Sequence, residues 1–111
     1  MPFEFGDIVL VPFPFASQAK SKRRPAVIVS NRTYNAGRPD VVVMPITSRL
    51  PSFFGVGEVP VGQWQTAGLL KPSAIKPVFA TLEQALIIRQ LGILDVADQT
   101  ALRQAIGKVL G

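Results

Sequence analysis

Short apolar runs broken by proline are the feature that most restricts how this chain can fold. In the first half, residues 8–11, 25–31 and 41–47 form three runs rich in β-branched residues. Such runs are typical of strands, and proline, which lacks an N–H, fits only the end or edge of a strand. We therefore expect the first strand to end at Pro12 or to continue only as an edge. The third run is apolar throughout and predicts a strand buried on both faces.

The segments between these runs predict loops. Residues 16–24 are small, polar and basic, residues 32–40 are rich in Asn, Gly and Pro, and both read as loops. A long irregular loop follows the third run, with further strands expected near 57–61 and 73–79. Residues 82–94 favour a short helix ended by Gly92, although Ile87 and Ile88 would also fit a strand.

The last seventeen residues predict a clearer helix. Asp95 is placed to cap it, and Asp98 falls in its first turn. One apolar stripe is expected on this helix, formed by Ala97, Leu102, Ile106, Val109 and Leu110. The pattern as a whole predicts a small β-barrel or strongly bent sheet with helices at its carboxyl end.

Length and hydropathy limit the organisation of the chain. At 111 residues the chain is expected to form one domain, 1–111. No apolar run approaches the roughly 20 residues of a membrane span, and the first residues do not resemble a signal peptide. The cytoplasm is therefore the expected location.

Composition excludes several classes of chemistry. Cysteine and histidine are both absent, so we expect no disulfide, no thiol nucleophile, no metal site and no cofactor.

Positive charge is concentrated in one part of the chain. The net charge is +5, from twelve Lys and Arg against seven Asp and Glu. Between residues 20 and 49 the only acid is Asp40, whereas seven cations lie there: Lys20, Lys22, Arg23, Arg24, Arg32, Arg38 and Arg49. Such a segment attracts polyanions, above all nucleic acid. The alternative is a solvated basic face that only aids solubility.

Two strand ends carry residues suited to binding a phosphate. Arg24 stands directly before the second run, and Thr47, Ser48 and Arg49 end or follow the third. If these strands are antiparallel neighbours, Arg24 and Thr47 lie at the same rim of the sheet. A guanidinium beside a hydroxyl then suits a phosphate held for in-line attack. The alternative is that Arg24 forms a surface ion pair and that Thr47 and Ser48 cap a turn.

Four segments, in this order, resemble the MazF/PemK family of toxin endoribonucleases from bacterial type II toxin–antitoxin pairs. They read GDIVLVPFPF, KSKRRPAVIVSN, VVVMPITSR and AGLLKPSAIK, and the resemblance extends from Gly6 to the terminal helix. It implies an SH3-like barrel of strongly bent antiparallel strands with a carboxyl-terminal helix. It also implies a homodimer, metal-independent cleavage of single-stranded RNA and inhibition by a cognate antitoxin.

The resemblance assigns roles to particular residues. The family's functional arginine, in an Arg-Pro pair, matches Arg24, and its functional threonine, in an Ile-Thr pair, matches Thr47. A guanidinium rarely gives up its proton. We therefore expect Arg24 chiefly to stabilise the transition state, Thr47 to hydrogen-bond the phosphate and Ser48 to substitute for Thr47. The general base is not identifiable from the sequence.

Other residues have two possible roles each. We expect four cations to contact RNA phosphates: Lys20, Lys22, Arg23 and Arg49. Asn31 could contact a base edge or form a turn. Phe15 and Trp64 could stack on bases, with burial as the alternative. For Asp40 and Glu58 we expect no catalytic role.

Two other functions remain open at this stage. A branch that shares this fold poisons gyrase by binding it. That branch carries a tryptophan near the carboxyl end, whereas the single Trp of this chain is Trp64. A non-catalytic nucleic-acid-binding barrel is the third possibility.

Overall fold

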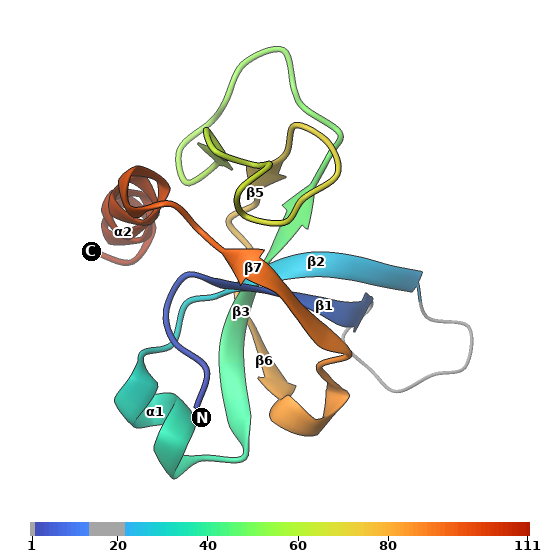
Figure 1. Cartoon of the computed structure of the whole chain (residues 1–111). Helices are drawn as coiled ribbons and strands as arrows, with labels where there is room; N and C mark the ends of the chain where they lie inside the picture. The colour runs from blue at the N-terminus through green and yellow to red at the C-terminus, as the bar shows by residue number, and fades with distance from the viewer. Residues whose placement is uncertain (1, 14–21) are drawn as a thin grey trace.

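The computed structural model describes residues 2–13 and 22–111, which form a bent sheet with two α-helices (Figure 1). The strands are β1 (Asp7–Phe13), β2 (Lys22–Ile28), β3 (Asp40–Thr47), β4 (Val59–Pro60), β5 (Ala74–Ile75), β6 (Ala80–Glu83) and β7 (Arg89–Ile93). The helices are α1 (Arg32–Gly37) and α2 (Val96–Leu110), with a 3-10 turn at Gln84–Leu86.

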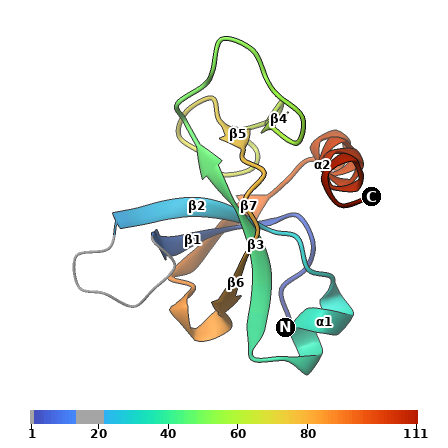
Figure 2. The same cartoon turned by 180° about the vertical axis from the view of Figure 1, so that it is seen from behind.

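All strand pairs are antiparallel, in the order β4-β5-β3-β2-β1-β7, with β6 also paired to β3. The sheet curls into a half-barrel with the carboxyl-terminal helix at its side, which confirms the predicted fold class. Both α-helices lie on one flank of the sheet, and the ends of β1 and β2 that carry Phe13 and Lys22 point to the other (Figures 1 and 2).

The central strands bury both of their faces, as the apolar runs predict. In β3, Met44 and Ile46 belong to one core cluster, and Val41 and Val43 belong to a second cluster on the opposite face. This separation follows from the strand period of two, because neighbouring side chains point to opposite faces. Each face of the central strands packs against a core cluster, so polar side chains are disfavoured on both faces. This explains the low polarity of these runs.

The proline rule also holds in β1. This strand pairs with β7 only as far as Leu10, but it continues beside β2 through Pro12 to Phe13. Beyond Leu10 it therefore has one partner strand among the described residues. On the β7 side of β1 there is no ladder at Pro12, so its missing N–H leaves no hydrogen bond unmade. This is how a proline is tolerated in a strand.

The predicted loop at 32–40 is wrong, because its first part forms helix α1. The Asn31 side chain accepts a hydrogen bond from the Tyr34 N–H at 2.9 Å and caps the helix. Asn35 is buried, with 2 % of its surface exposed. Its side-chain amide donates to the Phe3 carbonyl at 2.8 Å and to the Ser30 carbonyl at 3.0 Å. The bond to Phe3, a distant part of the chain, helps to hold a one-and-a-half-turn helix that local propensity alone does not support.

The predicted helix at 82–94 is also wrong. Residues 80–83 form β6 against β3, and residues 89–93 form β7 against β1, with the 3-10 turn between them. The isoleucine pair had left a strand open as the alternative. β1 and β3 each offer an edge on which another strand can pair. Pairing with these edges favours strands at 80–83 and 89–93 over a helix, because tertiary contacts override weak helical propensity. The basic loop likewise ends earlier than predicted, because β2 begins at Lys22.

Helix α2 begins as predicted but buries a narrower stripe. Asp95 caps it by accepting the Ala97 N–H at 3.0 Å. Leu102 is fully buried and Ile106 packs on the same core, whereas the other predicted stripe residues are exposed: Ala97, Val109 and Leu110. Asp98 accepts the N–H groups of residues 62 and 63, both at 2.9 Å. The described helices include none that is long and apolar enough to cross a membrane.

A backbone contact joins the 67–68 segment to β7. Gly68 has a φ of +85°, and a Cβ built on it would lie 2.1 Å from the Leu91 carbonyl oxygen. A Cβ on Gly92 would lie 2.4 Å from the Ala67 carbonyl oxygen. Only glycine fits at both positions, because any side chain would push the two backbones apart.

Replacing Gly68 with Ala should therefore destabilise the fold. The positive φ alone costs about 1–2 kcal/mol, and the backbone clash adds to it. Gly107→Ala is the matched control, because that Cβ meets nothing within 4 Å and lies within α2. The control should gain about 1 kcal/mol in the free energy of unfolding, measured in urea. A Gly68→Ala protein as stable as the wild type would contradict the backbone contact.

Candidate functional site

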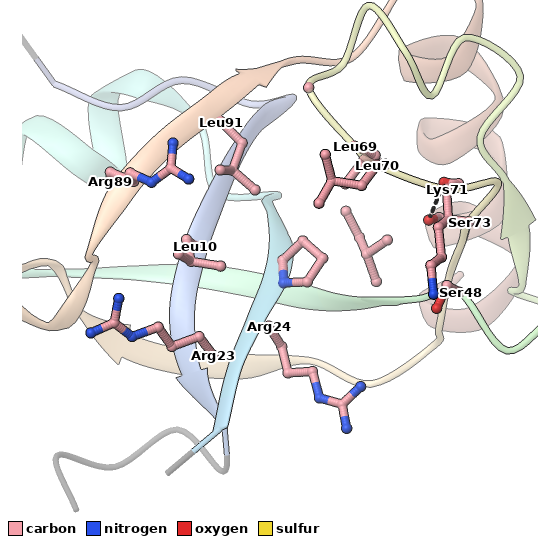
Figure 3. A pocket seen from close by; sticks show the side chains of 13 residues that line it. Leu10, Arg23, Arg24, Ser48, Leu69, Leu70, Lys71, Ser73, Arg89 and Leu91 are labelled. Atoms are coloured by element: carbon pink, nitrogen blue, oxygen red, sulfur yellow. Dashed lines mark hydrogen bonds between the residues drawn. The ribbon is translucent and has the colours of Figure 1, made fainter. Parts of the chain in front are cut away.

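A cavity of about 480 Å³ opens where β2 and β3 separate (Figure 3). Its walls come from β1, β2, β3, β7 and the segment 68–73. The lining residues are Leu10, Arg23, Arg24, Pro25, Ile46, Ser48, Gly68, Leu69, Leu70, Lys71, Ser73, Arg89 and Leu91. Apolar side chains form much of the floor, and cations and hydroxyls lie around it, which is the composition of a site for a partly apolar anion.

The rim expected from the sequence is present. β2 and β3 are antiparallel, with Ala26 paired to Pro45. Arg24 and Thr47 each lie two residues beyond this last pair, so they belong to the same end of the two strands. Pro25 stands between, and it has no N–H to extend the ladder. The strands therefore part at this point, and the cavity opens between them.

The two hydroxyls predicted at this rim are placed differently. Ser48 lines the cavity beside Arg24, whereas Thr47 is not among the lining residues. The Thr47 Oγ1 accepts a hydrogen bond from the Arg49 N–H at 3.1 Å. This bond is the turn contact that stood as the alternative, and it leaves the Thr47 hydroxyl hydrogen available for donation. Ser48 is therefore an exposed residue that lines the cavity, whereas Thr47 is half-buried and does not line it.

Three polar lining residues, Lys71, Ser73 and Arg89, are not singled out by the sequence analysis. Lys71 and Ser73 follow the Gly68 contact, and the Ser73 hydroxyl donates to the Lys71 carbonyl at 2.8 Å. Lys71 lay within a segment that carried the family resemblance, which was the available signal. The sequence predicts a helix at Arg89, and only its actual position in β7 brings it to the cavity. In Figure 3, Lys71, Ser73 and Ser48 lie at one end and Arg89 at the other.

The cavity is electropositive. Four of its lining residues are cations, namely Arg23, Arg24, Lys71 and Arg89, and none is an acid. The two acids expected to play no catalytic part make contacts elsewhere. Asp40 pairs with Arg38 at 2.9 Å, and this hydrogen bond holds the pKa of Asp40 below its usual range. The Glu58 carboxylate accepts the Gly55 N–H at 2.8 Å.

The remaining predicted residues are not brought into the cavity. Asn31 caps α1, beyond the opposite end of β2 from Arg24. Lys22 and Arg49 are exposed neighbours of lining residues. Trp64 is partly buried against the core, in line with its burial alternative. Lys20 and Phe15 lie outside the described residues.

A family model for "PemK-like, MazF-like toxin of type II toxin-antitoxin system" matches residues 4–110. The chain belongs to the PemK/MazF toxin family. This confirms the resemblance seen in the four sequence segments. No curated protein matches the chain.

Solved structures agree with the family assignment of this PemK/MazF toxin. The Mycobacterium tuberculosis toxin MazF-mt6 is 27 % identical, with a TM-score of 0.74 over 91 % of this chain and 92 % of that one. A MazE–MazF complex from Deinococcus radiodurans is 22 % identical, with a TM-score of 0.78 over 100 % and 98 % of the two chains. A mycobacterial endoribonuclease solved with its cognate antitoxin is 20 % identical, with a TM-score of 0.75 over 99 % and 94 %. The last two similarities concern the fold alone.

In the described part of this PemK/MazF toxin, no group of three or more His, Cys, Asp or Glu side chains could hold a metal ion. The polar groups that the cavity does offer are guanidinium, ammonium and hydroxyl groups. These are donors, and they bind and polarise an anion directly.

Proposed function

We propose that this toxin is a sequence-selective endoribonuclease that cleaves single-stranded RNA without a metal ion. The observation that carries the proposal is the position of Arg24 at a cavity lined by four cations, the Ser48 hydroxyl and no acid. The Ser73 hydroxyl also lines the cavity, but its hydrogen is already donated to the Lys71 carbonyl. A phosphodiester is the ligand whose charge and oxygens match that set of donors. The name of a structural relative, an endoribonuclease solved with its cognate antitoxin, supports the same activity.

The proposed reaction uses the substrate's own nucleophile. The 2′-hydroxyl attacks the adjacent phosphate and its proton passes to a base, while the bond to the 5′-oxygen of the next nucleotide breaks and that oxygen takes up a proton. The products are a 2′,3′-cyclic phosphate, which water can open to a 3′-phosphate, and a 5′-hydroxyl end. The protein has to align this attack and stabilise the charge that develops on the phosphorane.

Arg24 suits the task of charge stabilisation. It lies on a strand beside Pro25, which restricts the preceding backbone to an extended conformation. The residues that follow are buried, so the start of the side chain is held by a rigid element while the guanidinium remains exposed. A donor fixed in this way loses little entropy when it meets the phosphate. Thr47 and Ser48 would donate hydroxyl hydrogens to the same group.

The other cations would contact flanking phosphates. Lys20, Lys22, Arg23 and Arg49 add affinity and salt dependence without reading the bases. We also propose that the toxin acts as a homodimer in the cytoplasm and is inhibited by a cognate antitoxin. The relatives solved as MazE–MazF complexes support the antitoxin as a partner.

The direct test is incubation of the purified protein with a long single-stranded RNA in EDTA. Discrete fragments with 5′-hydroxyl ends are expected. Intact RNA with a shifted band would indicate a binding barrel without catalysis and would overturn the proposal. Intact RNA together with binding to gyrase would favour a gyrase poison instead.

Replacing Arg24 with Ala should slow cleavage by about 100- to 1000-fold, since one preorganised donor to a developing anion is worth about 2.7–4 kcal/mol. Folding should be unchanged, because the guanidinium is exposed. Arg32→Ala removes an exposed arginine that does not line the cavity, and it should cleave at the wild-type rate. A well-folded Arg24→Ala protein with wild-type single-turnover rates would exclude the assignment.

The two hydroxyls are separated by a second set of variants. Ser48→Ala and Thr47→Val should each slow cleavage by about tenfold, the value of one hydrogen bond to a charged group of roughly 1.5 kcal/mol. Thr47→Ser keeps the hydroxyl and should remain near the wild-type rate. If Thr47→Val has no effect, the hydroxyl serves only the turn with Arg49. If the double variant Thr47→Val, Ser48→Ala cleaves RNA no more slowly than Thr47→Val alone, Ser48 has no part in the reaction.

A further inference from the structure

We propose that Arg23 and Arg89 together bind a second phosphate of the RNA, next to the one that is cleaved. The inference rests on the proposed function, because it places a single RNA strand in the cavity. It adds a residue from β7 that the family resemblance did not indicate. It also defines the substrate, which must carry a phosphate beside the scissile one.

The strand register brings the two arginines to one face of the sheet. β1 lies between β2 and β7, with Leu10 paired to Arg89 and Pro12 paired to Arg23. Directly paired residues project on the same side, and so do residues two apart on one strand. Arg23, Leu10 and Arg89 therefore share a face. Figure 3 shows the two arginines on either side of Leu10.

The spacing suits one shared anion. β2 and β7 lie roughly 10 Å apart across β1, and the two pairs are offset along the strands by roughly 7 Å. Long side chains starting on the two outer strands can converge on a group above β1. Both arginines are exposed, so neither is held away from that position by packing.

No acid balances this pair of charges. The chain has no Asp or Glu between residues 8 and 39, and no residue lining the cavity is acidic. In the part of the chain that the structure describes, the one ion pair joins Arg38 to Asp40. Two like charges on the same face repel each other, and a phosphate placed between them relieves that repulsion.

The pair is separate from the proposed catalytic end. Arg23 and Arg24 are consecutive, and their side chains diverge in Figure 3, with Arg24 directed toward the end that holds Lys71 and Ser48. Leu69 and Leu91 lie between the two ends in Figure 3, and Leu10 lies beside the arginine pair. The cavity of about 480 Å³ falls within the range of roughly 300–1,000 Å³ for small-molecule sites. One phosphate at each end and the intervening nucleoside on the apolar floor would fill it.

The first experiment measures the salt dependence of RNA binding. The probe is a mixed-sequence single-stranded oligonucleotide with 2′-deoxy sugars throughout, which cannot be cleaved by 2′-hydroxyl attack. Arg89→Gln should reduce the slope of log K against log salt by about 0.7, the value for one phosphate contact on a single strand. Arg32→Gln removes the same charge from helix α1 and should leave the slope unchanged. An unchanged slope for Arg89→Gln, or an equal decrease in both variants, would overturn the proposal.

The second experiment locates the phosphate. Once the wild-type cleavage position is mapped, an oligonucleotide of that sequence is made with a 2′-deoxy nucleotide at the scissile position. Neighbouring phosphates are then replaced one at a time by a neutral methylphosphonate. Arg89→Gln should weaken binding of the unmodified strand about three- to tenfold, and should have no further effect when the contacted phosphate is already neutral. If Arg89→Gln weakens binding by the same factor on every modified oligonucleotide, a contact between Arg89 and one specific phosphate is excluded.

Failure of this inference can be distinguished from failure of the proposed function. If the wild-type protein cleaves RNA and Arg89→Gln keeps its salt slope, the second phosphate site is excluded and the endoribonuclease proposal remains. If no RNA is cleaved but Arg89→Gln lowers the slope, the phosphate contact is supported and the catalytic proposal fails.

Discussion

The antiparallel pairing of β2 with β3, and its end at Pro25, is the constraint on which the candidate site depends. Pairing sets Arg24 and Thr47 at the same rim. The missing N–H of Pro25 ends the ladder there and lets the strands part. Without the pairing the two proposed site residues would be unrelated in space, and without the proline the ladder could continue across the opening. Within two residues, the chain thus passes from a buried, hydrogen-bonded sheet to exposed side chains that can donate hydrogen bonds.

The opposite wall of the cavity depends on two glycines. The contact of the 67–68 segment with β7 positions the residues that follow it, including Lys71 and Ser73. Helix α2 supports the start of the same region from outside, because the Asp98 carboxylate accepts the N–H groups of Gly62 and Gln63. Two distant parts of the chain therefore hold one short loop, and its side chains can face Arg24 without regular secondary structure of their own.

Charge and apolar surface are combined at this site in a way that suits a nucleotide better than a simple ion. The cations and hydroxyls match phosphates, and the leucines match a base or ribose. No acid lines the cavity to offset its four cations, and Asp40 pairs with Arg38 elsewhere. In the reaction proposed for this PemK/MazF toxin, neither histidine nor cysteine is required, because the donors stabilise the developing charge and the nucleophile belongs to the substrate.

The sequence by itself determined the central strands, the start of α2 and the rim that carries Arg24 and Thr47. Those features follow from local properties: β-branched runs, proline positions and a capping aspartate. Only the tertiary structure decided that residues 89–93 form a strand, that residues 32–37 form a helix and that Arg89 and Lys71 reach the same cavity as Arg24. In each case the local propensity is weak, and partners far along the chain supply the stabilisation. β1 offers an edge to β7, Phe3 accepts a bond from Asn35, and the 67–68 segment meets β7 through glycine, contacts that no local pattern encodes.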